Sequence, residues 1–244
     1  MWKTLFGRCL YQTSGGSRVF QNPIFRWLQF DSEALQTVIN RYHPQRPGLY
    51  YIRSLILAAQ MQPAASCMLG LGGGGAAHAL SPFLRGNLLT VVECNAEVID
   101  IATRFFMINQ LTNLNIVHMD ANVFLQQAKM QFQHLLVDLF NAETFPADCN
   151  SDLFFSNCKR LLLPTGILAV NLANRHEQWP IFQLIKKQFL QATVTLPVKG
   201  SSNMVILASN SGSVTPLLDL LKKYKKLRRL TWNAQWGCVA EIDG

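Results

Sequence analysis

The sequence predicts an α/β fold in which a mostly parallel sheet carries helices on both faces and a short β-rich region precedes it. Three observations favour this fold. The chain has 244 residues, enough for one large domain or one domain with a small appendage. It is 49% hydrophobic and only 15% charged, which suits a sheet that is buried on both faces. From Ser66 onward, short apolar runs alternate with helix-length segments, as in strands joined by helical crossovers.

The first 65 residues depart from this alternation. Residues 15–31 combine aromatic and β-forming residues with turn signals, so we expect a small β-rich region there. Residues 32–40 and 49–60 are predicted to be helical. We therefore divide the chain into an N-terminal β-rich region, residues 1–48, and a main domain, residues 49–244.

Seven strands and five intervening helices can be assigned along the main domain. The strands are residues 66–71, 88–93, 114–119, 134–140, 166–172, 192–198 and 204–209. The helices are residues 76–83, 96–109, 122–130, 152–162 and 177–189. The last two strands have no helix between them, so they are expected to form an antiparallel hairpin at an edge of the sheet.

The loops that follow the first two strands have the features of a nucleotide-like ligand site. In parallel sheets of this kind, ligands bind at the carboxyl ends of the strands, near the point where the strand order reverses. The first loop is rich in glycine, which permits a tight turn and close approach of a ligand to backbone N–H groups. Glu93 ends the second strand, where a carboxylate can accept hydrogen bonds from both hydroxyls of a ribose. The glycines expected to contact the ligand are Gly70, Gly72, Gly73 and Gly74.

Carboxylates also follow the third and fourth strands. Asp120 is followed by Ala121 and can accept from the amine of an adenine, although it equally suits the N-cap of the next helix. Asp138 ends the fourth strand and leads into a loop that contains Asn141 and Glu143. A glycine loop and three carboxylates at four successive strand ends together describe a crevice for an adenosyl group.

With these segments in order, the chain resembles the spermidine synthases, a branch of the class I S-adenosylmethionine-dependent methyltransferase fold. The resemblance extends from about Arg26 to Ser209. The sequences GLGGGG, VVECN, MDAN and VDLFNAETFP are similar to the glycine loop, the ribose-binding segment, the adenine-side segment and the reaction-side segment of that family. The fold that this resemblance implies is a Rossmann-like, seven-stranded sheet of the methyltransferase type.

The resemblance also implies an activity and a set of residue roles. Family members transfer an aminopropyl group from decarboxylated S-adenosylmethionine to a polyamine such as putrescine, and methylthioadenosine leaves. The acceptor is therefore expected to be a small-molecule amine. By resemblance Asp138 is the catalytic carboxylate, Glu93 binds the ribose, Asp120 and Ala121 bind the adenine, and Gln36, Tyr51, Asn141 and Glu143 lie on the substrate side.

Two departures from the family pattern leave the reaction open. Gly75 stands where the family's glycine loop has an aspartate, and Asn141 stands where it has a second reaction-side aspartate. A glycine at position 75 removes the repulsion that an aspartate would exert on the carboxylate of intact S-adenosylmethionine. A methyltransferase that uses intact S-adenosylmethionine is therefore the second hypothesis, and a non-catalytic binder of adenosyl ligands is the third.

The charge of the chain raises the question of its partners. The formal net charge is +8, and six of the eight residues from Lys222 to Arg229 are cationic. We interpret this segment as a helix with a solvated basic face; nucleic acid binding is the less favoured interpretation. The sequence leaves a homodimer open.

Two further features bear on location and metal content. The chain contains no clean apolar run of membrane-spanning length and no secretory signal, so we expect a cytoplasmic protein without membrane association. Its six cysteines lack zinc-ligand spacing, which predicts reduced thiols and no metal site.

Overall fold

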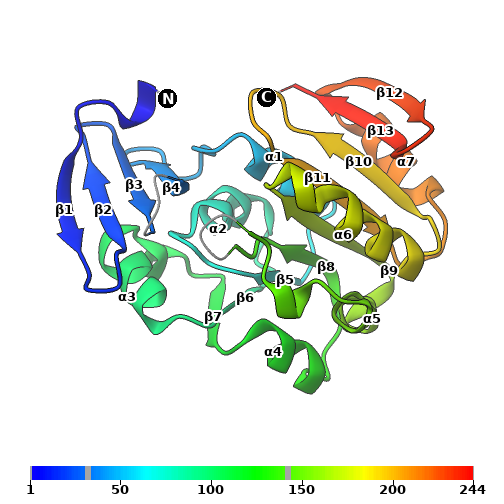
Figure 1. Ribbon diagram of the computed structural model, residues 1–244, viewed down its shortest axis with the longest axis horizontal. Helices are drawn as coiled ribbons and strands as arrows, with labels where there is room; N and C mark the ends of the chain where they lie inside the picture. The colour runs from blue at the N-terminus through cyan, green and yellow to red at the C-terminus, as the bar shows by residue number, and fades with distance from the viewer. Residues whose placement is uncertain (1, 31–33, 141–143, 244) are drawn as a thin grey trace.

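The computed structural model describes residues 2–30, 34–140 and 144–243, which form two sheets (Figure 1). The smaller sheet is antiparallel, with its strands in chain order. These strands are β1 (Arg8–Gln12), β2 (Arg18–Gln21), β3 (Phe25–Gln29) and β4 (Leu35–Asn40). The predicted N-terminal β structure is thus present, but the helix predicted over residues 32–40 is wrong for its described part, where residues 35–40 form β4. Thr37, Val38 and Ile39 are β-branched and buried, which favours the strand β4 over a helix.

The larger sheet has nine strands in the order β12-β13-β10-β11-β9-β8-β5-β6-β7. They are β5 (Ser66–Leu69), β6 (Leu89–Glu93), β7 (Leu114–His118), β8 (Phe132–Val137), β9 (Leu162–Leu172), β10 (Thr193–Pro197), β11 (Met204–Ser209), β12 (Leu227–Asn233) and β13 (Gly237–Ile242). Strands β5 to β9 pair in parallel, and β10 and β11 form the predicted antiparallel hairpin. The predicted α/β fold class is confirmed, with the C-terminal hairpin β12–β13 added to the seven predicted strands. Because β13 pairs with β10, the β10–β11 hairpin does not lie at the edge of the sheet.

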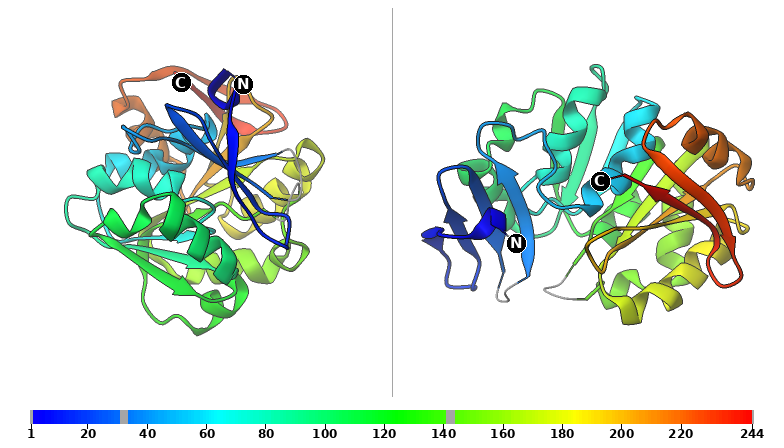
Figure 2. Two further views of the ribbon diagram at one scale, coloured as in Figure 1. Left: turned by 90° about the vertical axis from the view of Figure 1, so that its left-hand side faces the viewer. Right: turned by 90° about the horizontal axis from the view of Figure 1, so that it is seen from above.

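Helices cover both faces of the larger sheet, as predicted (Figures 1 and 2). They are α1 (Tyr51–Met61), α2 (Gly75–Leu80), α3 (Ala96–Phe105), α4 (Ala121–Gln127), α5 (Asp152–Arg160), α6 (Arg175–Gln188) and α7 (Thr215–Lys223). Alternate residues of β5 belong to two different cores: Met68 packs with α1, α2 and α7, whereas Cys67 and Leu69 pack with α4, α5 and α6. Both faces of the central strands are therefore buried, which explains their continuous apolar sequences.

The basic segment from Lys222 to Arg229 is not one helix. Helix α7 ends at Lys223, and strand β12 begins at Leu227. Leu227 and Leu230 pack against the core from this strand, and Arg228 and Arg229 are exposed. Leu217, Leu221 and Leu227 have near-helical spacing in the sequence, but the first two lie in α7 and the third lies in β12, so they do not mark a single helix face.

The strand order defines where the chain reverses direction across the sheet. From β5 the chain proceeds to β6 and β7 on one side, and it then returns to β8 and β9 on the other side. The loops that follow the neighbouring strands β5 and β8 therefore lead to opposite sides of the sheet, which opens a crevice at the carboxyl ends of these two strands. Gly70 follows β5 and Asp138 follows β8, so the two predicted site segments meet at this point.

Candidate active site

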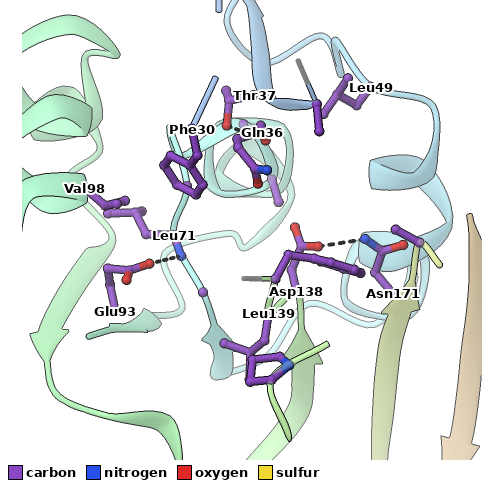
Figure 3. A pocket seen from close by; sticks show the side chains of 18 of the residues that line it. Phe30, Gln36, Thr37, Leu49, Leu71, Glu93, Val98, Asp138, Leu139 and Asn171 are labelled. Atoms are coloured by element: carbon purple, nitrogen blue, oxygen red, sulfur yellow. Dashed lines mark hydrogen bonds between the residues drawn. The ribbon is translucent and has the colours of Figure 1, made fainter. Parts of the chain in front are cut away.

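A cleft of about 1050 Å³ lies at the carboxyl ends of the parallel strands. Its walls also include Phe30, which follows β3, and Gln36 and Thr37 of β4 (Figure 3). The first turn of α1 lines the cleft as well. Most of the predicted site residues line it: Gln36, Tyr51, Gly70, Gly72, Glu93, Asp120, Ala121 and Asp138. Asn141 and Glu143 lie outside the described residues.

Asp138 lines the cleft, and both of its carboxylate oxygens accept hydrogen bonds. The phenol of Tyr51 donates to Oδ2 at 2.9 Å, and the amide of Asn171 donates to Oδ1 at 2.8 Å. Burial raises the pKa of Asp138, and the two hydrogen bonds act against that rise by stabilising the anion. Burial and the neighbouring carboxylate raise the pKa of Tyr51 well above its usual value, so its phenol stays protonated as a donor. The result is a carboxylate in the cleft that is able to accept a proton.

The glycine loop is shaped mainly by its contacts with the rest of the chain. Gly70, Gly72 and Gly74 have φ angles of +94°, +51° and +73°, which favour glycine. A Cβ atom at Gly70 would lie 2.3 Å from the backbone oxygen of Asp138, and one at Gly74 would lie 2.5 Å from a methyl group of Ile108. Much of the glycine content is thus required by packing at the switch point, in addition to any ligand.

Gly73 and Gly74 are placed differently from the glycines that line the cleft. The N–H of Gly73 donates to the hydroxyl of Thr37 at 2.8 Å, which ties the loop to β4. Gly74 packs against Ile108 from the segment after α3. Neither glycine is among the described lining residues of the cleft, so their contact with a ligand stays a prediction.

Glu93 and Asp120 each form hydrogen bonds with the backbone at the cleft. Oε2 of Glu93 accepts from the N–H of Leu71 at 3.0 Å, and its Oε1 accepts from the N–H of Asn95 at 2.9 Å. The carboxylate of Glu93 thereby joins the glycine loop to the start of α3 (Figure 3). Oδ1 of Asp120 accepts from the N–H of Val123 at 3.0 Å, so Asp120 is the N-cap of α4 and also lines the cleft.

The charge of the cleft is opposite to that of the chain. Although the net charge is +8, no lysine, arginine or histidine occurs among the described lining residues. The basic segment from Lys222 to Arg229 lies at the far edge of the sheet, where four strands separate β12 from β8. Five carboxylate side chains line the cleft: Glu93, Glu97, Asp120, Asp138 and Asp148. The cleft is thus suited to cationic ligands.

Several residues of this site were not predicted from the sequence. Asn171 lies near the carboxyl end of β9, which includes the predicted strand 166–172, so the rule that pointed to the other strand ends would also have identified it. Glu97 lies in the first turn of α3 and accepts from the hydroxyls of Thr13 and Ser17 at 3.0 and 2.7 Å, which links the N-terminal sheet to the cleft. Such a contact between distant segments has no local signal in the sequence.

Three other sequence-based expectations concern metals, thiols and membranes. Across the described ranges, no group of three or more His, Cys, Asp or Glu side chains is arranged to hold a metal ion. All six cysteines are free, and Cys67, Cys149 and Cys158 are buried. None of the helices in the described part of the chain is both long enough and apolar enough to cross a membrane.

Curated proteins with sequences similar to this chain include polyamine aminopropyltransferases. That of Neisseria meningitidis is 26% identical over 203 residues, which are 81% of this chain and 77% of the relative. That of Vibrio vulnificus is 29% identical over 163 residues, which are 63% of this chain and 54% of the relative. No protein-family profile matches the chain.

Solved structures similar to this fold include spermidine synthases. A probable spermidine synthase from Corynebacterium glutamicum superposes with a TM-score of 0.71 and 15% identity, covering 98% of this chain and 91% of that one. A spermidine synthase in complex with the transition-state analogue AdoDATO superposes with a TM-score of 0.67 and 16% identity, covering 90% and 80%. The human methyltransferase-like protein 13 in complex with SAH has a TM-score of 0.60 and 15% identity, covering 77% and 97%. The fold alone therefore does not distinguish the two kinds of transferase.

Proposed function

We propose that this chain is a polyamine aminopropyltransferase of the spermidine synthase family, a proposal supported by its curated relatives and by its fold. Its donor substrate is decarboxylated S-adenosylmethionine, and its acceptor is a small polyamine such as putrescine. The products are methylthioadenosine and the extended polyamine.

The carboxylate lining of the cleft carries this proposal. Both substrates of aminopropyl transfer are cationic, because the donor has a sulfonium and an ammonium and the acceptor is an alkyl amine that is protonated at neutral pH. The described lining offers them five carboxylates and no cationic side chain. The carboxylate of intact S-adenosylmethionine would find no cationic partner among these residues. The charge of the cleft therefore favours the decarboxylated donor over the methyltransferase alternative.

Asp138 is the proton acceptor in the proposed reaction. The acceptor amine arrives as an ammonium and gives one proton to the carboxylate of Asp138, which frees the lone pair of its nitrogen. That nitrogen forms a bond to the aminopropyl carbon attached to the sulfonium, and the carbon–sulfur bond breaks. The electron pair of the broken bond returns to sulfur, so methylthioadenosine leaves as a neutral thioether and the new secondary amine carries the positive charge. Because the sulfonium is a good leaving group, the chain mainly positions the reactants and accepts the proton.

The remaining site residues divide between the two substrates. We assign Glu93 to the ribose hydroxyls and Asp120 with Ala121 to the adenine, with Gly70 and Gly72 against the donor. Gln36 and Tyr51 contact the reacting side, and Figure 3 shows the Gln36 amide and the Asp138 carboxylate directed into the same pocket. Asn141 and Glu143 are assigned to the acceptor by resemblance alone.

The test compares the two donors directly. Purified protein is incubated with putrescine and either decarboxylated or intact S-adenosylmethionine, and methylthioadenosine, spermidine and methylated products are quantified by mass spectrometry. Calorimetry measures the affinity for each donor, and we expect a preference for the decarboxylated form of at least about tenfold, or 1.4 kcal/mol. Tighter binding of intact S-adenosylmethionine together with a methylated product would overturn the proposal.

A matched variant tests the role of Asp138. Asp138→Asn keeps the size of the side chain and removes its basic carboxylate, so product formation should fall by about a hundredfold or more. Methylthioadenosine affinity should stay close to that of the unaltered protein, because this product carries no ammonium for Asp138 to bind. Unchanged spermidine formation in Asp138→Asn would show that another group accepts the proton.

A further inference from the structure

A chain of polar side chains runs from the β10–β11 turn to the carboxylate of Asp138. The hydroxyl of Ser201 donates to Oδ1 of Asn203 at 2.6 Å, and Nδ2 of Asn203 donates to Oδ1 of Asn171 at 2.9 Å. Nδ2 of Asn171 then donates to Oδ1 of Asp138 at 2.8 Å, as the dashed line between these two residues in Figure 3 shows. In each of these three hydrogen bonds, the residue nearer to Asp138 accepts and the residue farther from it donates.

The direction of these hydrogen bonds fixes the orientation of the side-chain amides of Asn203 and Asn171. An asparagine has one accepting oxygen and one donating nitrogen, so accepting from Asn203 obliges Asn171 to present its N–H group to the carboxylate. A flipped Asn171 would place its oxygen against Oδ1 of Asp138 and its nitrogen against that of Asn203. Both contacts would be repulsive, and the upstream hydrogen bond therefore specifies the downstream one.

Strand pairing places this chain of side chains beside the cleft. Asn171 is 2% exposed, and its backbone pairs with that of Val205 in β11, while the preceding residue Val170 pairs with Val137 in β8. Asp138 and Asn171 are the residues that directly follow the paired residues Val137 and Val170, so they lie side by side near the carboxyl ends of neighbouring strands. A buried amide is costly unless it is hydrogen-bonded, and the described hydrogen bonds of Asn171's side chain go to Asp138 and Asn203.

We propose that Asn171 and Asn203 are positioning residues that act through Asp138, holding its carboxylate ionised and oriented for the acceptor amine. This inference rests on the proposed function for the identity of the reaction. It assigns a specific task to one residue of β9 and one residue of the β10–β11 turn, neither of which has to contact a substrate.

The electrostatic surroundings of Asp138 agree with this role. Among the described titratable groups, the phenol of Tyr51 on α1 is the one that is hydrogen-bonded to Asp138, whereas β9 and the β10–β11 turn contribute amides and a hydroxyl. Burial raises the pKa of Asp138, and the donors from Asn171 and Tyr51 oppose that rise. Removing the Asn171 donor should therefore raise the pKa of Asp138 further.

Carbon-detected NMR of protein with ¹³C-labelled aspartate measures this directly, with the Asp138 signal assigned by its absence in Asp138→Asn. Asn171→Leu, which is close in volume, should raise the pKa of Asp138. Asn203→Leu should raise it less, because the bond between Asn171 and Asp138 is retained without its orienting partner. Both variants should lower kcat/KM for aminopropyl transfer, Asn171→Leu by about tenfold to a hundredfold.

Gln178→Leu is the matched control for a purely structural role. The buried amide of Gln178 donates to the backbone oxygens of Leu172 and Ser202, so it anchors the same strand end and the same turn without contacting Asp138. Its replacement should lower the melting temperature and leave the pKa of Asp138 unchanged. An unchanged pKa in the two asparagine variants, or an equal rise in Gln178→Leu, would overturn the inference. If Asn171→Leu does not fold, Asn203→Leu carries the comparison alone.

The two proposals fail in different ways in this experiment. The NMR titration needs no substrate, so it reports on the asparagines even if the protein transfers no aminopropyl group. Absence of aminopropyl transfer by the unaltered protein would overturn the proposed function. A normal transfer rate with an unmoved pKa in the asparagine variants would overturn the positioning role only.

Discussion

The phenol of Tyr51 and the carboxylate of Asp138 are joined by a hydrogen bond of 2.9 Å between the start of α1 and the loop after β8. Tyr51→Phe removes this donor and little else, so kcat/KM for aminopropyl transfer should fall by about tenfold. The same variant should raise the pKa of Asp138, because Tyr51 stabilises the anion. Steady-state kinetics at several pH values measure both effects. Tyr42→Phe, at an exposed tyrosine, serves as the control and should match the unaltered protein.

Asp138 should reduce the stability of the folded chain at neutral pH. Its folded-state pKa lies above the ordinary value of an aspartate, so the folded protein binds this proton more tightly than the unfolded chain does. The contribution of Asp138 to the free energy of unfolding therefore rises as the pH falls through its folded-state pKa. Asp138→Asn should melt at a higher temperature than the unaltered protein at neutral pH, and the gap should narrow in acid. Calorimetric melting curves across the pH range measure this gap, and a lower melting temperature for Asp138→Asn at neutral pH would contradict it.

The fold was predictable from the sequence because its central strands are buried on both faces. Residues such as Met68 and Leu69 pack with opposite helix layers, so the strands appear in the sequence as short apolar runs between helices. The segment at 32–40 was mispredicted because its apolar residues fit either element, and pairing with β3 decides for the strand. The β12–β13 hairpin was missed because the cationic residues of β12 interrupt its apolar pattern. In addition, Leu227 continues the helical spacing of Leu217 and Leu221 in α7.

Two sources predicted residues of the candidate site: the position of a residue directly after a strand, and the family resemblance, which pointed to Gln36 and Tyr51. Asp138, Glu93 and Asp120 were found by their position, and they line one cleft. Thr37 and Glu97 act through contacts with residues that are distant in sequence, which no local pattern reveals. The absence of cationic side chains from the described lining of the cleft could not be predicted, because the net charge of +8 gives no information on where the cations lie.

Substitution of three glycines by alanine should distinguish the cost of a strained backbone from the cost of steric crowding. Gly70 has a positive φ and would place a Cβ 2.3 Å from the oxygen of Asp138, whereas Gly86 has a positive φ of +85° with nothing within 4 Å. Gly75 has neither feature, because a Cβ there would meet Ile52 and Thr37 at 3.4 and 3.5 Å. Gly86→Ala should cost about 1–2 kcal/mol of unfolding free energy, Gly70→Ala clearly more, and Gly75→Ala close to nothing. Denaturant unfolding gives the three values, and a Gly70→Ala protein as stable as Gly86→Ala would contradict the contact with Asp138.

Thr37 should couple the N-terminal sheet to the donor site. Its buried hydroxyl accepts from the N–H of Gly73, so Thr37→Val leaves that N–H without its partner at a cost of about 1–3 kcal/mol. Because Gly73 belongs to the glycine loop, affinity for methylthioadenosine should fall as well. Thr37→Ser keeps the accepting oxygen and should retain that affinity. Calorimetric titration of both variants provides the measurement, and equal affinities would show that the loop holds its shape without β4.

Position 75 should control the choice between the two donors. By resemblance, an aspartate there binds the amine of the aminopropyl tail, and the space around Gly75 accepts a Cβ at ordinary contact distances. Gly75→Asp should therefore bind decarboxylated S-adenosylmethionine about tenfold more tightly and intact S-adenosylmethionine more weakly, because it adds a charge-assisted partner for an ammonium and a repulsion for a carboxylate. Gly75→Asn has nearly the same size and no charge, so it separates electrostatics from crowding. If both variants change the two affinities equally, the effect of position 75 is steric, and the charge of the existing carboxylates is sufficient to select the donor.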